Sequence, residues 1–433
     1  MRILLLSYHL LPDQTSEGLC VAKTARALAD SDHHVEVVTA AQTAHPMLEG
    51  IPVHRVTPNG DRMPWWTKRL QRLNSLARGR TRGRWLWIRL DAAANIALGC
   101  APDDYAWASA AAAKALALLR EPGGEPFDLV YSRLNHFRSH LAAMHVKREM
   151  PGMPWCAHFS DPWPGHLYPE GYKLTATRTG LMEKRQEAIL DRMLATADSL
   201  TFPAERLSRF LLSGPRARHI GKAHVAPHLG YFQVSAPIYS PGEVFTIVFT
   251  GLLLPQRYPG TFLRALRRFL DATPSAAGKI EVLFVGRNMP LLDKDVDALD
   301  LSHVLRVSPY SDPDDVWPVL CAADVLLLLE SPMQEGVFMP SKLADYLSAR
   351  RPILALSPEQ GTVSDYLSEG GGLRVDADSE EGVLDALRTL YNRWQLGCLH
   401  DLVPPDSLVS HVLPERVVPL YEAAFRQAVE ASK

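Results

Sequence analysis

The chain has 433 residues, of which 47% are hydrophobic and 22% are charged, and its formal net charge at pH 7 is −2. This length and composition are typical of a globular protein with two or three domains, and the near-neutral charge gives no reason to expect nucleic acid as a partner. The five cysteines are odd in number and form no CxxC pair, which argues against a disulfide framework and a structural zinc site.

Two apolar stretches could be mistaken for membrane segments. The run at the N-terminus ends at Pro12 and Asp13 and no A-x-A cleavage pattern follows, so we interpret it as a buried strand rather than a signal peptide. The alanine-rich stretch 92–119 is interrupted by a proline and two aspartates, and it lacks the roughly 20 uninterrupted apolar residues of a membrane helix. Together with the reduced cysteines, this favours a cytoplasmic protein.

Strand and helix patterns alternate through the first half of the chain. The alternation predicts a parallel sheet covered by helices, and ligands bind outside the carboxyl ends of the strands in such folds. GxGxxG is absent, which disfavours NAD and FAD, although Gly18 would let a ligand approach the backbone just before the first helix. The predicted strands are 2–7, 33–39, 51–56, 127–132, 154–159, 200–202 and 219–226, and the predicted helices are 19–29, 103–120, one ending near 149, 178–197 and 204–212.

Polar residues follow two of these strands where each strand ends. Arg133 and His136 come after strand 127–132, and Asp161 comes after strand 154–159. Because neighbouring parallel strands end at one edge of the sheet, these side chains suggest a pocket wall. Helix capping, turn formation or surface pairing explains each of them about as well on spacing alone.

Residues 62–89 are unusually basic. The segment contains nine lysines or arginines, four tryptophans and no acidic residue. Basic side chains beside tryptophan are typical of segments that contact an anionic membrane surface, so peripheral contact with the inner face of the cell membrane is one hypothesis. A solvated excursion of the chain, or an arm that binds polyanions, is the alternative.

The second half repeats the alternation after a linker predicted at 228–243, where prolines and glycines are scattered without a period. The two halves therefore predict two doubly wound α/β domains facing each other across a cleft. The predicted strands are 245–250, 280–285, 304–307, 323–329, 353–356 and 373–375, and the predicted helices are 261–272, 315–322, one beginning at 340 and ending before Pro352, 380–394 and 414–429.

Lys342 lies near the start of a helix that follows a buried strand and a polar loop. The free N–H groups and the dipole of such a helix start favour an anion, and the lysine adds a full positive charge. Asp345 comes one turn later, where its carboxylate could accept hydrogen bonds from ribose hydroxyls. The stretch therefore indicates a nucleotide site, and the alternative is an ordinary βαβ unit with a solvated Lys342.

Several stretches resemble motifs of the GT-B glycosyltransferases, in particular the retaining family 4 and its bacterial polysaccharide-building members. They are RILLLSYHLLPDQTSEG, HFSDPW, FTGLLLPQRYPG and FMPSKLADYLSARRPILAL. The resemblance implies two Rossmann-like domains: an acceptor domain at 1–228 and a nucleotide-sugar donor domain at 229–413. It also implies that the C-terminal helix, 414–433, packs back on the first domain.

The resemblance also implies roles for individual residues. Lys342 and Arg257 would contact the donor pyrophosphate and act in catalysis. Arg133, His136 and Asp161 would face the acceptor. The remaining donor-binding residues would be Gly18, Gly251, Ser308, Tyr310, Glu335, Ser341 and Asp345.

The implied activity is transfer of a hexosyl or related group from a nucleotide-diphosphate sugar to a glycan, lipid-linked or small-molecule hydroxyl, without cofactor or metal. Asp293, Asp295 and Asp297 form a DxDxD string, which we interpret as a solvated face rather than a metal site. A catalytically silent binding subunit, an inverting transferase and a nucleotide-sugar epimerase are the alternatives. Departures from the family pattern support the silent subunit. Glu17 and Arg351 stand at usual glycines, and Asp345 stands at a usual glutamate. The usual pair of glutamates eight residues apart is missing, because Leu343 lies eight residues after Glu335 and Val337 lies eight residues before Asp345.

Overall fold

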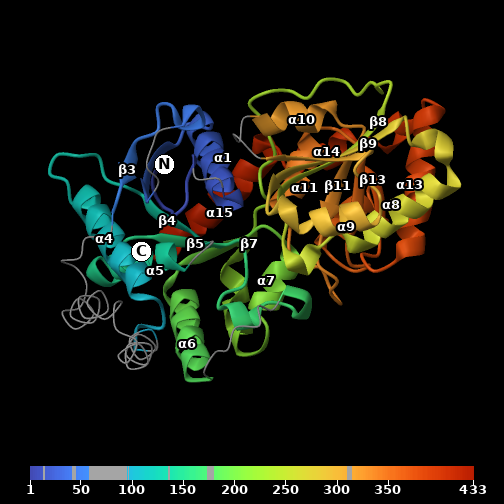
Figure 1. Ribbon diagram of the computed structural model, residues 1–433. Helices are drawn as coiled ribbons and strands as arrows, with labels where there is room; N and C mark the ends of the chain where they lie inside the picture. The colour runs from blue at the N-terminus through green and yellow to red at the C-terminus, as the bar shows by residue number, and fades with distance from the viewer. Residues whose placement is uncertain are drawn as a thin grey trace, which may run out of the picture. The chain divides into compact units, whose positions relative to one another are not determined.

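The computed structural model describes residues 1–12, 15–40, 45–57, 95, 97–134, 137–172, 180–309 and 315–433. The chain forms two compact units, and each is built around its own parallel sheet (Figure 1). The first unit comprises Met1–Tyr168, Lys173–Ala226 and Val418–Lys433, and the second comprises Pro169–Tyr172 and Pro227–Val417.

The first unit contains a seven-stranded parallel sheet in the order β3-β2-β1-β4-β5-β6-β7. Its central strands are buried on both faces, which explains why their sequences are continuous apolar runs rather than alternating ones. The strands are β1 (Arg2–Leu6), β2 (His34–Thr39), β3 (Val53–Arg55), β4 (Leu129–Leu134), β5 (Trp155–Phe159), β6 (Ser199–Phe202) and β7 (Ala223–Val225).

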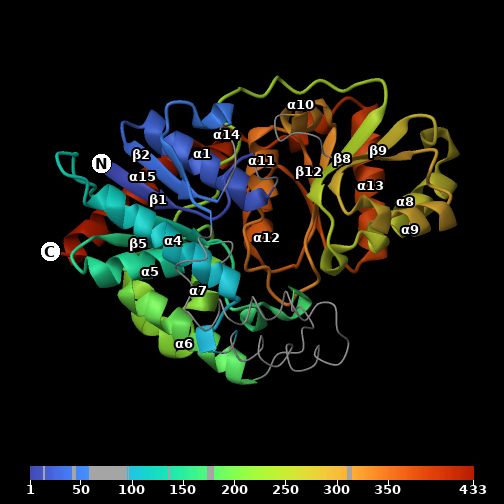
Figure 2. The same cartoon turned by 60° about the vertical axis from the view of Figure 1, so that its left-hand side comes forward.

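Helices cover this sheet, and one of them comes from the far end of the chain. Tyr421 and Phe425 of the C-terminal helix pack on Tyr131 of β4, with ring centroids 5.9 and 5.1 Å apart. Figures 1 and 2 show this helix, coloured red, among the blue and green elements of the first unit. The helices are α1 (Ser16–Asp30), α4 (Pro102–Leu119), α5 (Arg138–Glu149), α6 (Gly180–Thr196), α7 (Glu205–Leu211) and α15 (Pro414–Ala431).

The second unit contains a six-stranded parallel sheet in the order β10-β9-β8-β11-β12-β13. Its core lies between the sheet and the helix pair α8 and α13, where Phe269 meets Tyr391 at 5.4 Å. The strands are β8 (Phe245–Leu252), β9 (Ile280–Arg287), β10 (Leu305–Pro309), β11 (Val325–Leu329), β12 (Ile353–Leu356) and β13 (Gly372–Val375). The helices are α8 (Gly260–Ala272), α9 (Asp293–Ala298), α10 (Val316–Ala322), α11 (Ser341–Ser348), α12 (Thr362–Leu367), α13 (Glu380–Gln395) and α14 (Asp406–Ser410).

Residues 228–243 contain no helix or strand, and side chains attach them to the second unit. The Tyr239 hydroxyl donates to Asp324 at 2.6 Å, and the Tyr231 N–H donates to the Ser348 hydroxyl at 2.9 Å. Arg351 is 3% exposed and donates to the carbonyls of Pro237 and Cys321. The arginine that stands at a usual glycine of the resembling family therefore anchors this segment.

Most predicted elements are present with ends shifted by a few residues, and one strand prediction was wrong over most of its length. Residues 214–222 form a 3₁₀ helix, and only Ala223–Val225 of the predicted strand 219–226 pairs in the sheet. Residues 214–222 are basic and contain Gly214 and Gly221, so this segment has no apolar face to bury between helices. The short helices α12 and α14 were not predicted, because six and five residues carry too little periodicity.

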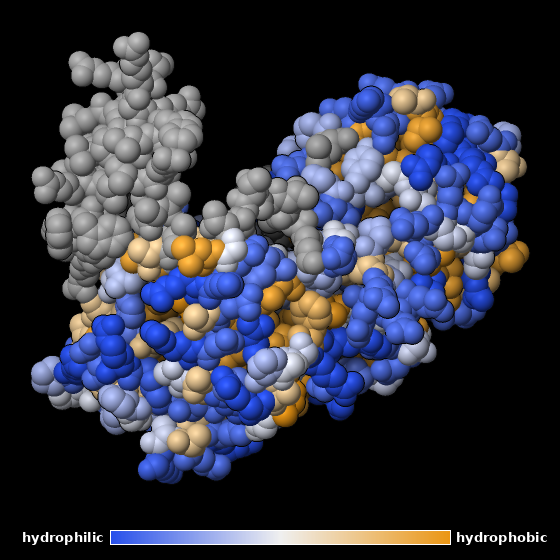
Figure 3. Space-filling model, turned by 90° about the horizontal axis from the view of Figure 1, so that it is seen from below, coloured by the Kyte–Doolittle hydropathy of each residue, from blue (hydrophilic) through white to orange (hydrophobic). Residues whose placement is uncertain are grey.

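The basic segment 62–89 lies outside the described residues, so membrane contact stays a prediction from the sequence. Within the described ranges, no helix combines the length and apolar character needed to cross a bilayer. The described surface seen in Figure 3 is mostly hydrophilic, with apolar side chains gathered in separate patches.

Glu36 joins the amino-terminal ends of three strands in the first unit. Its carboxylate binds Arg2 of β1 at 2.8 Å, His54 of β3 at 2.7 Å and its neighbour His34 at 3.1 Å. Burial raises the pKa of this carboxyl group, but the hydrogen bonds with Arg2 and the two histidines outweigh burial and lower the pKa to about 2. The cluster thus stabilises the sheet through an ionised glutamate.

This cluster predicts an acid-dependent loss of stability. The pKa of Glu36 is lower in the folded state than its ordinary value of 4.5, so its contribution is complete above that pH and is lost as the pH falls toward 2. We expect the loss to be about 2 kcal/mol, because the partly exposed partners are screened by solvent. Urea unfolding at a series of pH values should show a smaller acid dependence in Glu36→Gln than in the parent or in the exposed control Glu121→Gln. Equal acid dependence in all three proteins would contradict this role.

Candidate functional site

The order of the second sheet identifies where a ligand would bind. Strands β9 and β10 lie on one side of β8, whereas β11, β12 and β13 lie on the other, so the winding reverses between β8 and β11. In open α/β sheets, ligands bind outside the carboxyl ends of the strands at this reversal. Arg257 follows β8 in a 3₁₀ turn, and Lys342 lies in the first turn of α11, which follows β11. The two predicted cations therefore belong to the segments that leave this edge.

Lys342 is held by packing rather than by an ion pair. Its ammonium nitrogen lies 4.6 Å from the centroid of the Phe249 ring, and no hydrogen bond or ion pair to this nitrogen is present in the described part of the chain. Burial and the positive charge of Arg257 lower the pKa of Lys342 well below its usual range, while Asp345 opposes them. A negatively charged ligand would offset both the burial and the repulsion, so the environment favours an anion beside Lys342.

Gly251 makes room for this lysine. A β-carbon at position 251 would lie 2.5 Å from Cε and 2.9 Å from Nζ of Lys342, and the φ angle of Gly251 is +110°. The backbone angle requires glycine here, and a β-carbon would in addition displace the end of the Lys342 side chain. The predicted donor residues Gly251 and Lys342 are therefore in direct contact.

Tyr346 fixes helix α11 against the sheet. Its hydroxyl accepts a hydrogen bond from the Thr250 N–H at 3.2 Å and donates to the Leu327 carbonyl at 3.3 Å. These bonds connect α11 to β8 and β11, the two strands at the reversal. Asp345, one residue earlier, is 8% exposed, and Ser341 is partly buried at the start of the helix.

The loop between β11 and α11 is held at two places. Gly336 forms a parallel bridge with Gly361, and a β-carbon on Gly361 would come within 2.8 Å of the Gly336 Cα. The segment Pro169–Tyr172, distant in sequence, belongs to the second unit: the Ser331 hydroxyl donates to the Gly171 carbonyl at 2.7 Å, and Tyr172 meets Phe338 at 5.1 Å. Neither contact was predicted, because both join residues whose local patterns indicate only loops.

Glu330 is the functional candidate in this unit that the sequence analysis did not select. It directly follows β11, is 3% exposed, and has no hydrogen-bond partner for either carboxylate oxygen among the described residues. Burial raises the pKa of Glu330 to about 8, with the charge of Arg257 acting in the opposite direction. The available signal was an acidic residue immediately after an otherwise apolar strand.

The other predicted donor residues lie in different parts of the second unit. Glu335 is exposed on the loop before α11. Ser308 lies on β10, the outermost strand beyond β9, with its hydroxyl 3.5 Å from the Pro309 carbonyl. Tyr310 lies outside the described residues, so the predicted loop 308–310 is described only in part.

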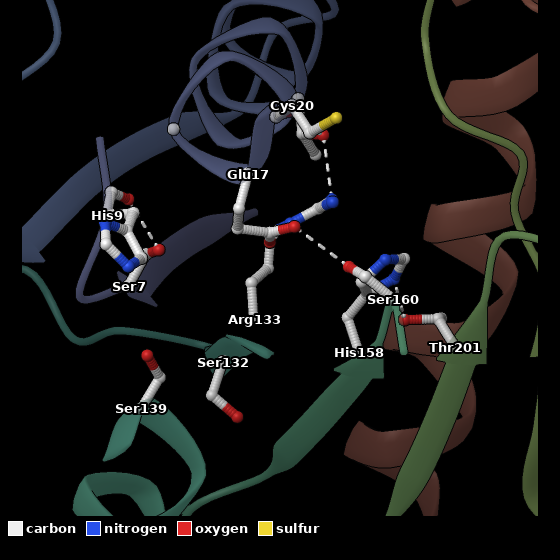
Figure 4. Close-up of polar contacts among 12 residues, drawn as sticks. Ser7, His9, Glu17, Cys20, Ser132, Arg133, Ser139, His158, Ser160 and Thr201 are labelled. Carbon is white, nitrogen blue, oxygen red and sulfur yellow. Dashed lines mark hydrogen bonds and ion pairs between the residues drawn. The ribbon is translucent and has the colours of Figure 1, made fainter. Parts of the chain in front are cut away.

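The first unit has its own reversal of winding, between β1 and β4, and a buried polar cluster lies there (Figure 4). Glu17 of α1 accepts hydrogen bonds from Arg133 Nε at 3.1 Å and from the Ser160 hydroxyl at 3.0 Å. Arg133 also donates to the Thr24 hydroxyl at 3.0 Å and to the Tyr421 hydroxyl at 3.3 Å. The side chains of Glu17 and Arg133 are 5% and 1% exposed, so this is an internal ion pair.

This cluster changes the interpretation of two sequence features. Glu17, which stands at a usual glycine of the resembling family, has a charged partner in Arg133. The predicted acceptor residue Arg133 makes its described contacts with buried side chains of the first unit. Asp161, which follows Ser160 in the sequence, is partly buried. Gly18 lies in the first turn of α1, where its N–H donates to the Thr15 hydroxyl at 3.0 Å. His136 lies outside the described residues.

A metal site was not predicted, and the described residues contain no group of three or more histidine, cysteine or acidic side chains placed to hold a metal ion. Asp293, Asp295 and Asp297 lie on the short helix α9, where Asp295 accepts a hydrogen bond from the Tyr258 hydroxyl at 2.8 Å. The tyrosine contact gives Asp295 a structural partner.

No protein-family model and no curated protein sequence matches the chain. Solved structures do match along nearly the full length. HepE of Anabaena in complex with UDP and glucose has a TM-score of 0.67 at 13% identity, with 98% of this chain and 99% of that chain covered. Sucrose-phosphate synthase of Thermosynechococcus elongatus has a TM-score of 0.61 at 15% identity, with 99% and 97% covered.

A protein of Listeria monocytogenes assigned as a UDP-N-acetylglucosamine 2-epimerase also matches, with a TM-score of 0.55 at 11% identity and coverage of 99% of this chain and 97% of that chain. Identities this low make the likeness one of architecture. With its two parallel-sheet α/β domains of seven and six strands, the chain has the GT-B fold.

Proposed function

We propose that the chain is a glycosyltransferase that moves a sugar from a nucleotide-diphosphate sugar to a hydroxyl of a glycan, lipid-linked or small-molecule acceptor. The observation that carries the proposal is the placement of Lys342: a partly buried lysine at the reversal of a parallel sheet, under the positive charge of Arg257 and with no hydrogen-bonded carboxylate among the described residues. The match to a GT-B protein in complex with UDP and glucose supports the ligand class.

In the proposed mechanism, bond cleavage between the sugar and the diphosphate is the difficult step. Lys342, Arg257 and the free N–H groups at the start of α11 would stabilise the negative charge that grows on the leaving diphosphate. Asp345 would bind the ribose hydroxyls and Glu335 the donor sugar. We propose a retaining, metal-independent reaction, in which the donor phosphate itself takes the acceptor proton.

The test is a panel of UDP-, ADP- and GDP-sugars. Binding is measured by thermal shift and calorimetry, and turnover by release of nucleoside diphosphate with a panel of glycan and lipid-linked acceptors. Binding followed by acceptor-dependent release would support the transferase. Failure of every nucleotide sugar and nucleoside diphosphate to bind would contradict it.

Two other functions give different results in the same assay. An epimerase, which one structural match favours, would interconvert the sugar without needing an acceptor. A silent binding subunit would bind a nucleotide sugar and release nothing. Anomeric analysis of the product would distinguish retention from inversion.

Gly251→Ala should weaken binding of nucleoside diphosphates at least about tenfold, because its β-carbon would displace Lys342 from its position and remove part of a charge-assisted contact. Gly278→Ala is the matched control, since a β-carbon there meets no atom within 4 Å. Calorimetric titration with the best ligand of the panel measures both dissociation constants. Unchanged affinity in Gly251→Ala would show that Lys342 does not bind the diphosphate.

A further inference from the structure

Glu330 is buried at the carboxyl edge of the second sheet, and among the described residues its carboxyl group lacks the hydrogen bonds that a buried carboxyl group needs. Its backbone N–H donates to the Leu356 carbonyl at 2.9 Å, which fixes its position between the ends of β11 and β12. Neither carboxylate oxygen has a partner in the part of the chain that the structure describes. Burying a polar group in this way is costly, so this carboxyl group is a candidate for binding a ligand.

The surroundings of Glu330 include positive charge. Arg257, from the loop after β8, acts on it electrostatically, and its Nε is also buried without a described hydrogen-bond partner. The charges of Arg257 and of Asp345 on α11 both act on Lys342, in opposite directions. Gly336 is a neighbour of this carboxyl group: a β-carbon on it would lie 3.4 Å from Glu330 Oε2, an ordinary contact distance. Arg257 thus links the unpartnered Glu330 carboxyl group to Lys342, because its charge acts on both side chains.

The protonation state of Glu330 decides what it can do there. Since burial raises its pKa to about 8, the group is mostly a neutral carboxylic acid near neutral pH. A neutral acid does not repel phosphate oxygens, and its O–H can donate a hydrogen bond to one of them. An ionised Glu330 would instead oppose a diphosphate.

We propose that Glu330 binds the donor diphosphate as a protonated acid, and that diphosphate binding beside Arg257 and Lys342 is therefore coupled to proton uptake by Glu330. The inference rests on the proposed function, which supplies the diphosphate. It adds a third residue to the diphosphate site, and one that donates a hydrogen bond without adding charge.

The experiment is calorimetric titration of the wild-type protein with UDP, ADP and GDP in buffers of different ionisation enthalpy. The proposal predicts that near pH 8 the wild-type protein takes up about half a proton more per bound nucleotide than a variant without the Glu330 carboxyl group, because half of Glu330 is then ionised in the free protein. The dissociation constant should be constant below about pH 7 and rise by up to about tenfold per pH unit above pH 8. The terminal phosphate loses its second proton near pH ~6, so the ligand contributes little to this change.

Glu330→Gln should remove this half proton of uptake and weaken the pH dependence above pH 8, because the amide keeps the shape and cannot ionise. Glu359→Gln, an exposed glutamate in the loop after β12, removes the same charge and should behave like the wild type.

Three results would overturn the inference. Equal uptake in Glu330→Gln and in the wild type would assign the proton to Lys342. Wild-type affinity that does not change between about pH 7 and pH 9 would contradict coupling even if the glutamine variant failed to fold. Binding of no nucleotide at all would contradict the proposed function itself, and with it the diphosphate that Glu330 is inferred to bind.

Discussion

Lys342→Ala is expected to lower kcat/KM for the nucleotide sugar by about 10²–10³-fold, which corresponds to about 2.7–4 kcal/mol of transition-state stabilisation. The variant removes the cation next to Arg257, where the leaving diphosphate would gain charge. The protein should remain folded, because the ammonium group makes no hydrogen bond among the described residues and its removal relieves repulsion with Arg257.

Two further variants separate charge from packing at this position. Lys342→Met keeps an unbranched apolar stem on the Phe249 ring and should lose activity as severely as alanine, if the charge is what matters. Lys294→Ala removes an exposed lysine on α9 and should leave activity unchanged. Steady-state release of nucleoside diphosphate measures all three variants. Activity of Lys342→Met close to that of the parent would show that the ammonium group has no part in the reaction.

The position of Lys342 could be predicted from local sequence, because a buried apolar strand, a loop and a helix start are all short-range patterns. The GT-B architecture followed from repeating those patterns and from the quoted motifs. The contact of Lys342 with Gly251 and Phe249 could not be predicted by pattern, since it depends on β8 and β11 pairing across about 80 residues of sequence.

Glu330 and Arg351 show the limit of sequence reasoning in this chain. Each is a charged residue whose side chain the sequence places on a loop or at a helix end, where exposure is the usual outcome. In the structure both are 3% exposed. Arg351 satisfies backbone carbonyls of distant segments, whereas Glu330 has no such partner in the described ranges. Only the three-dimensional arrangement distinguishes an anchoring charge from a candidate ligand group.

The departures from the family pattern at Glu17 and Arg351 both have structural partners within their own units. Glu17 forms an ion pair with Arg133, and Arg351 anchors the segment 228–243. These contacts show how the fold accommodates both departures. The donor panel is the test that distinguishes a silent subunit from an active enzyme.

Arg133→Leu is expected to destabilise the first unit by about 3–5 kcal/mol, because it leaves the Glu17 carboxylate buried without its charged partner. The substitution also removes the hydrogen bonds of Arg133 to Thr24 of α1 and to Tyr421 of α15. Strand β4 and helices α1 and α15 therefore lose the side chain that they all contact. Hydrogen exchange of β4 and α1 amides, together with urea unfolding, would measure this loss in the unit concerned.

The double variant Glu17→Leu with Arg133→Leu identifies the cause. Replacing both members of a buried ion pair by apolar residues is often close to neutral, so the double variant should recover most of the stability lost in Arg133→Leu. The surface control is Arg148→Leu, whose side chain is 68% exposed and pairs with Glu149, and it should cost at most about 1 kcal/mol. If the double variant were as unstable as Arg133→Leu, the cost would come from lost packing and hydrogen bonds around the arginine. The cluster at the reversal between β1 and β4 would then depend on Arg133 itself rather than on neutralising Glu17.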